Sequence, residues 1–77
     1  MNNTNYTNTA KLMYHMELKR LNKTRLALAA QISRNTITSI FKGKDVSMRV
    51  VHRVAVALDL SAIETAEIFF DEKLRNT

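Results

Sequence analysis

Apolar residues recur along the chain at spacings of three and four, which is the period of an amphipathic helix. The pattern predicts five helices, over residues 9–20, 23–30, 34–41, 48–58 and 62–74. The apolar residues expected to face the core are, in chain order, Leu12, Met13, Met16 and Leu21, then Leu26, Ala27 and Ala30, then Ile37, Ile40 and Phe41, then Val50, Val51, Val54, Ala55 and Leu58, and finally Ile63, Ala66, Phe69 and Phe70. Each helix therefore has one face that the others must cover.

Polar residues suited to capping precede the last four of these helices. Asn22, Ser33 and Ser47 each stand immediately before a predicted helix, where a side-chain oxygen can accept a hydrogen bond from a backbone N–H of the first turn. Ser61 and Glu64 have the spacing of a capping box. These local signals indicate where each of the four helices begins.

Turn-forming residues are scarce. The sequence has no proline, and its only glycine, Gly43, follows the third predicted helix, where a left-handed backbone often ends a helix. A β-rich fold would need more turn residues, so the chain is predicted to be all-α. Residues 1–8 are polar and are expected to form a flexible tail, and residues 9–77 a single domain.

The domain is small, and no covalent cross-link stabilises it. A chain of 77 residues buries only about 60 % of its unfolded surface, and the sequence contains no cysteine. A second copy of the chain is therefore one expected source of stability. Neither a signal peptide nor an apolar run of about 18 residues occurs, so we expect a cytoplasmic protein that does not contact the membrane.

The net charge of +5 is distributed unevenly along the chain. The window from Lys19 to Lys44 has no acidic residue, and its seven basic residues are Lys19, Arg20, Lys23, Arg25, Arg34, Lys42 and Lys44. After residue 54 the balance reverses, with five acidic residues against two basic ones. Such asymmetry within one domain predicts a face that binds a polyanion.

The second and third predicted helices have the features of a helix-turn-helix. They are short and three residues apart, with a small residue, Ala27, where they would cross and an apolar residue, Ile32, in the turn. The third helix has a polar face, formed by Arg34, Asn35, Thr38 and Ser39, opposite its apolar face. In a helix-turn-helix the N-terminal residues of the second helix meet base edges in the major groove.

Three stretches carry a family resemblance, namely Leu26-Ala27, residues 32–37 (ISRNTI) and residues 40–44 (IFKGK). In this order and spacing they resemble the Cro/cI (lambdoid repressor-like, XRE-type) helix-turn-helix family, and the similarity extends from about Leu12 to Phe70. The resemblance implies a compact five-helix domain whose third helix enters the major groove of double-stranded DNA. It also implies a symmetric homodimer on a palindromic operator.

By position, the resemblance assigns two sets of DNA contacts. The base-contacting set is Arg34, Asn35, Thr38 and Ser39, and the phosphate-contacting set is Lys23, Arg25, Lys42 and Lys44. Arginine can bridge O6 and N7 of guanine, and asparagine can bridge N6 and N7 of adenine, each worth about 1–3 kcal/mol of discrimination. The lysines would add affinity with little sequence information.

The chain departs from the family pattern at several positions. Gln31 replaces the glycine of the turn, so a left-handed backbone there would cost about 1 kcal/mol, and Lys23 replaces a glutamine. Leu28 and Val56 fall on sides of their helices that are normally polar. Together with Phe69 or Phe70, of which one is expected inside and the other half exposed, they could form a dimer or partner contact.

Nothing in the sequence indicates catalysis. Two histidines are too few for a metal site without carboxylate help, and Asp71-Glu72 resembles a catalytic pair only in composition. No motif for a cofactor or a small-molecule substrate occurs, so we expect a protein that is not an enzyme and needs no metal or cofactor.

Three functional hypotheses follow. The first is a sequence-specific DNA-binding transcriptional regulator, either a phage-type repressor or a Cro-like protein. The second is a modulator or antirepressor that keeps the fold but binds a repressor protein, since an acidic protein surface and DNA would select the same basic face. The third is a toxin-neutralising antitoxin.

Overall fold

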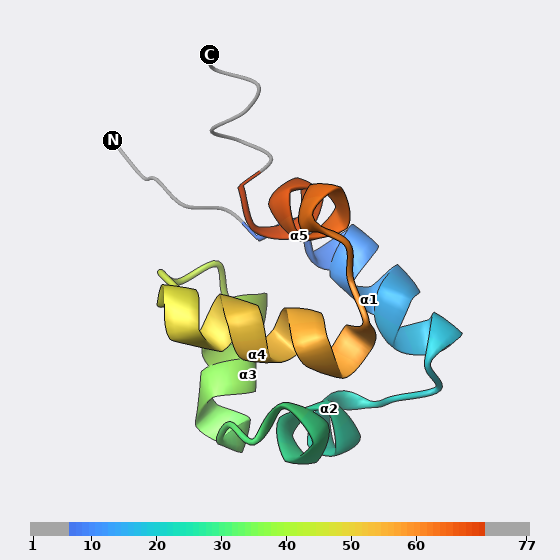
Figure 1. The fold of residues 1–77 in the computed structure, drawn as a ribbon. Helices are drawn as coiled ribbons and strands as arrows, with labels where there is room; N and C mark the ends of the chain where they lie inside the picture. Colours follow the sequence, from blue (N-terminus) through green and yellow to red (C-terminus); the bar gives the residue numbers. More distant parts are fainter. Residues whose placement is uncertain (1–6, 71–77) are drawn as a thin grey trace.

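The computed structural model describes residues 7–70, which form five helices and contain no strand. The helices are α1 (Thr9–Leu18), α2 (Lys23–Ala30), α3 (Arg34–Phe41), α4 (Met48–Leu58) and α5 (Ala62–Phe69) (Figure 1). The all-α prediction is confirmed. The bounds of α2, α3 and α4 agree with those predicted from the sequence, whereas α1 ends two residues before the predicted end at residue 20.

The predicted end of α5 is wrong. The helix ends at Phe69, and Phe70 leaves the helical conformation with φ −130°. The aromatic ring of Phe70 packs against the core from this non-helical position. The remainder of the predicted extension, residues 71–74, lies outside the described residues.

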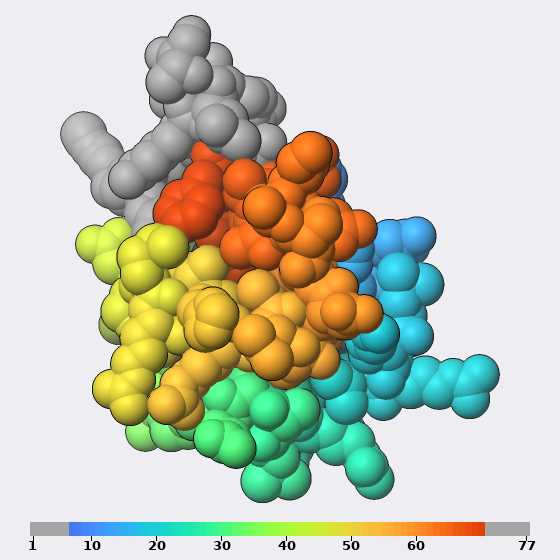
Figure 2. Space-filling model, in the orientation of Figure 1, coloured from blue at the N-terminus to red at the C-terminus, as the bar shows by residue number. Residues whose placement is uncertain are grey.

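Helix α4 packs between α2 and α5. It contacts α2 on one side and α5 on the other, while α2 also contacts α3 and α5 also contacts α1 (Figure 1). In the space-filling view its side chains fill the face between α5 and α2 (Figure 2). The buried core comprises Leu12, Met16, Leu26, Ala27, Ala30, Ile37, Ile40, Val51, Val54, Leu58, Ile68 and Phe69.

Two predicted core residues are on the surface. Met13 is 52 % exposed and Ile63 is 72 % exposed, whereas Ile68, which was not predicted, is fully buried. Met13 has helical spacing with Met16, but in α1 it is Leu12 and Met16 that the packing of the other helices buries. In α5 the position of α1 and α4 decides which apolar residues are covered, and Ile68 lies on that side with Phe69.

Four helices end with the same backbone turn, in which one residue is left-handed. The left-handed residues are Arg20 (φ 58°), Gln31 (φ 59°), Gly43 (φ 78°) and Asp59 (φ 57°). After α2, for example, the N–H of Ile32 donates to the carbonyl of Ala27 at 3.0 Å, which is the bond of a Schellman motif. Gln31 therefore keeps the left-handed backbone of the turn, a possibility that the sequence left open. Nothing in the sequence indicated a left-handed backbone at Arg20 or Asp59.

An apolar residue follows three of these left-handed positions. Leu21, Ile32 and Leu60 each come directly after one, and all three pack against the core. A non-glycine residue in this conformation costs about 1–2 kcal/mol. Burial of the next side chain is what offsets that cost at these positions.

Replacing Gln31 with glycine is expected to stabilise the protein by about 1 kcal/mol, because glycine adopts φ 59° without strain. The control is Ala29→Gly, at an exposed position within α2, which is expected to destabilise by about 0.5–1 kcal/mol. Urea denaturation of both variants measures the two changes. Changes of the same sign would show that the turn at Gln31 is not strained.

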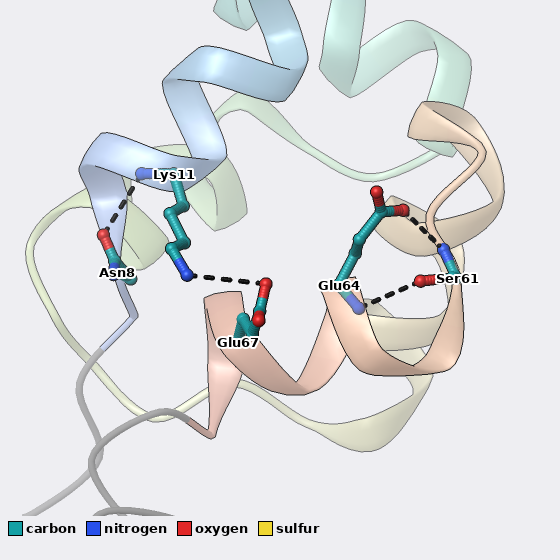
Figure 3. Close-up of polar contacts among 5 residues, drawn as sticks. All are labelled: Asn8, Lys11, Ser61, Glu64 and Glu67. Carbon is teal, nitrogen blue, oxygen red and sulfur yellow. Dashed lines mark hydrogen bonds and ion pairs between the residues drawn. The ribbon is translucent and has the colours of Figure 1, made fainter.

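The N-terminus of α5 carries the predicted capping box. The N–H of Ser61 donates to Oε1 of Glu64 at 2.8 Å, and the N–H of Glu64 donates to Oγ of Ser61 at 3.0 Å (Figure 3). The first of these bonds is the main reason that the pKa of Glu64 is lowered from its usual value, because it stabilises the charged carboxylate.

Asn8 connects the start of α1 to the end of α5. Its side-chain oxygen accepts from the N–H of Lys11 at 3.1 Å, and its own N–H donates to the carbonyl of Ile68 at 2.6 Å. Lys11 also forms an ion pair with Glu67, in which Nζ lies 3.4 Å from Oε1 (Figure 3). Asn8, predicted as the end of the tail, is therefore part of the fold, and residues 1–6 of that tail lie outside the described residues.

Candidate nucleic-acid interface

The turn between α2 and α3 has the geometry that the sequence predicted. Ser33 caps α3, with its Oγ accepting from the N–H of Thr36 at 3.0 Å and lying 2.9 Å from the hydroxyl of Thr36. Ala27 is buried in α2, which packs against α3, and Ile32 packs against the core from within the turn. Ala27 and Ile32 therefore help to set how α3 packs against α2.

The two faces of α3 differ sharply in exposure. Ile37 and Ile40 are buried, whereas Arg34, Asn35 and Thr38 are exposed. Ser39 is half-buried and contributes less to the outer face. The structure thus places the predicted base-contacting residues on the side of α3 away from the core, with Ser39 at its margin.

The first turn of α2 contacts side chains from both ends of α3. Nη1 of Arg34 donates to Oγ1 of Thr24 at 2.6 Å. The ammonium group of Lys23 lies 4.4 Å from the centre of the Phe41 ring, which is a cation–π contact. Phe41, predicted as a core residue, is only half-buried, and Lys23 lies over its ring. The hydrogen bond between Thr24 and Arg34 was not predicted from the sequence.

The predicted phosphate-contacting residues, Lys23, Arg25, Lys42 and Lys44, are all exposed. They come from two places, the first turn of α2 and the turn that ends α3. In that second turn the N–H of Gly43 donates to the carbonyl of Ile40, and the N–H of Lys44 donates to the carbonyl of Ser39. These bonds hold the backbone between Lys42 and Lys44 in place. Cations therefore come both before and after α3 in the chain.

One member of the basic window is paired with an acidic residue. Nζ of Lys19 lies 3.7 Å from Oδ2 of Asp59, and the side chain of Asp59 is 87 % exposed. An ion pair in water contributes little to stability, typically about 0–1 kcal/mol. It does, however, reduce the positive charge that Lys19 adds to the surface.

Arg53 links α4 to the turn of the helix-turn-helix. Its Nη1 donates to the carbonyl oxygen of Gln31 at 3.0 Å, across 22 positions of sequence. Because Gln31 is the left-handed residue between α2 and α3, this hydrogen bond connects the turn to α4. No local pattern in the sequence identifies Arg53, since it lies outside the basic window and among apolar residues of α4.

The residues predicted as a dimer or partner contact divide into two groups. Leu28 is 74 % exposed and Val56 is 67 % exposed. Phe69 is buried in the core, so its inclusion in that contact is corrected, and Phe70 is half-buried against the core. As predicted for this doublet, one ring is inside and the other is partly exposed.

Residues 7–70 show neither a cluster of metal ligands nor a helix that could span a membrane. Residues 7–70 contain no group of three or more His, Cys, Asp or Glu side chains placed to hold a metal ion. Within the same range, no helix has the length and apolar character needed to cross a membrane.

These features define a helix-turn-helix domain with a polar outer face on its second helix and exposed cations in the segments before and after that helix. A family model described as a Cro/C1-type HTH DNA-binding domain matches residues 11–71, and the chain belongs to this family. It is therefore a DNA-binding domain of the kind found in transcriptional regulators.

A solved structure has the same fold. The crystal structure of the transcriptional regulator VanUg, Form II, superposes with a TM-score of 0.69 over 88 % of this chain and 87 % of that one. The two sequences are 19 % identical, so the likeness concerns the fold. No curated protein matches the sequence.

Proposed function

We propose that this protein is a sequence-specific transcriptional regulator, a phage-type repressor or a Cro-like protein, that inserts α3 into the major groove of operator DNA. The observation that carries the proposal is the division of α3 into a buried face, with Ile37 and Ile40, and an exposed polar face that begins with Arg34 and Asn35. A helix held in this way can present its polar side chains to base edges without disturbing the core.

Recognition of bases is assigned to the start of α3. The guanidinium of Arg34 matches O6 and N7 of guanine, and the amide of Asn35 matches N6 and N7 of adenine. Thr38 lies one turn after Arg34 on the same exposed side. In this proposal it meets the next base pairs. Ser39, being half-buried, has the smallest reach of the four.

Affinity is assigned to the exposed cations that flank α3. Lys23 and Arg25 come from the first turn of α2, and Lys42 and Lys44 come from the turn after α3. Neutralised phosphates release condensed counterions, so binding through these residues should weaken steeply as salt rises. Contacts of this kind position the protein on the duplex and carry no sequence information.

The domain presents one α3 helix, and a symmetric homodimer would present two. Two such helices read half-sites about 34–36 Å apart, one turn of DNA, so the operator of a dimer is a palindrome. By occupying promoter DNA in this way, the protein would repress transcription.

The experiment that tests the proposal is a selection from randomised duplex DNA, repeated at two salt concentrations and read by sequencing. An enriched palindrome whose affinity falls steeply with salt supports direct operator recognition and gives the half-site spacing. A lack of enrichment, with only weak salt-sensitive binding, would contradict it.

A second function is favoured by one specific observation. Leu28 and Val56 are large, exposed and apolar, and they come from α2 and α4, which pack together. A modulator that binds a repressor protein would use such a surface. Under this alternative the protein co-purifies with a repressor protein and enriches no operator sequence, and a Leu28→Ser, Val56→Ser double variant loses that partner.

A further inference from the structure

One polar contact joins the proposed recognition helix to the helix before it. Thr24, in the first turn of α2, accepts a hydrogen bond at 2.6 Å from Nη1 of Arg34, the first residue of α3. Both side chains are exposed and lie ten positions apart in the sequence. An exposed arginine with a free side chain would otherwise sample many rotamers, each pointing its guanidinium in a different direction.

We infer that Thr24 is a positioning residue that aims Arg34 at a guanine of the operator. The inference rests on the proposed function, since it concerns how the same face reads DNA. The guanidinium is planar and carries five N–H donors in a fixed arrangement. With Nη1 bonded to Thr24, the edge formed by Nε and Nη2 keeps two parallel donors, the pattern that O6 and N7 of guanine accept.

The neighbouring cation does not compete for the threonine hydroxyl. The ammonium group of Lys23 lies over the ring of Phe41, 4.4 Å from its centre. Thr24 is therefore left to Arg34, and the first turn of α2 uses adjacent residues for two separate contacts with α3. A side chain already held in its binding rotamer loses less entropy when the base arrives, which raises affinity for the correct base.

Removing the Thr24 hydroxyl should therefore weaken guanine recognition in particular. Thr24→Val keeps the shape of the side chain, and it should raise the Kd for the selected operator by about 3- to 10-fold. On an operator in which that guanine is changed to adenine, and on random duplex DNA, the change should be under 2-fold. Thr24→Ser retains the hydroxyl and should restore most of the preference.

Two controls separate positioning from a structural role. Thr65→Val in α5 removes a hydroxyl that donates to the carbonyl of Ser61, the residue before the helix, and it should leave the preference for guanine unchanged. In an Arg34→Ala background Thr24→Val should have no further effect on operator binding, because the group that it positions is gone. Thermal unfolding of each variant reports any loss of stability.

The possible outcomes distinguish this inference from the proposed function. If the wild-type protein enriches no sequence, the proposed function fails and the inference fails with it. If the wild-type protein is selective and Thr24→Val keeps the same guanine preference, only the inference is overturned. Equal weakening of all DNA sequences by Thr24→Val would also overturn it, because that result assigns Thr24 to the phosphate backbone.

Discussion

Replacing Ile37 with alanine will lower the free energy of unfolding by about 2–5 kcal/mol. Ile37 is fully buried in α3, on the face opposite the proposed DNA contacts. The lost side chain removes apolar contacts and leaves a cavity that the surrounding helices fill only in part. Since a domain of 77 residues has a total stability of only about 4–12 kcal/mol, this single change removes a large part of it.

Urea denaturation followed by circular dichroism measures this effect. Ile37→Val is the graded variant, with an expected loss of about 0.5–1.5 kcal/mol, and it remains informative if the alanine variant does not fold. Leu28→Ala is the surface control, because Leu28 is exposed, and we expect a change within about 0.5 kcal/mol. A loss at Leu28 comparable to that at Ile37 would show that Leu28 is covered in solution, as it would be in a dimer.

Replacing Arg34 with alanine is expected to remove discrimination at one base pair of the operator. The loss is about 1–3 kcal/mol, or roughly 5- to 150-fold in Kd on the best site, and it disappears on a site in which that base pair is already wrong. The physical reason is that a bidentate contact to guanine is lost while the phosphate contacts remain.

Lys42→Ala is the matched comparison, since Lys42 is exposed in the turn that ends α3. It should weaken all DNA sequences alike and reduce the slope of log affinity against log salt by about one. Fluorescence anisotropy over a salt series, with the best operator and a single-base variant of it, measures both effects. If the two substitutions change affinity and specificity in the same way, our division between base readout and phosphate contact is wrong.

Local patterns in the sequence were sufficient to predict where most of the helices begin. Asn22, Ser33, Ser47 and Ser61 each cap a helix as predicted, because a capping bond joins residues only three positions apart. The ends of α2, α3 and α4 were also predicted, at Ala30, Phe41 and Leu58. Helical spacing also predicted the buried residues of α2 and, in α3, Ile37 and Ile40, whereas Phe41 is half-buried.

The candidate site was predicted in composition and only partly in geometry. The sequence placed Arg34, Asn35 and Thr38 on one polar face because they share one side of a helix. It gave no sign that Thr24 would bond to Arg34 or that Lys23 would lie over Phe41. Those contacts depend on the angle and distance at which α2 and α3 pack.

The contacts between distant segments depend on how the helices pack and could not be predicted from the sequence. Arg53 reaches the carbonyl of Gln31, and Asn8 bonds to Ile68, across separations that no local pattern spans. Packing also decided that Ile68 is buried and Ile63 is not, and that Arg20 adopts a left-handed backbone. Capping and helical periodicity involve residues within about one helical turn of each other. The contacts between distant segments and the choice of buried residues depend instead on how several helices pack to bury apolar surface.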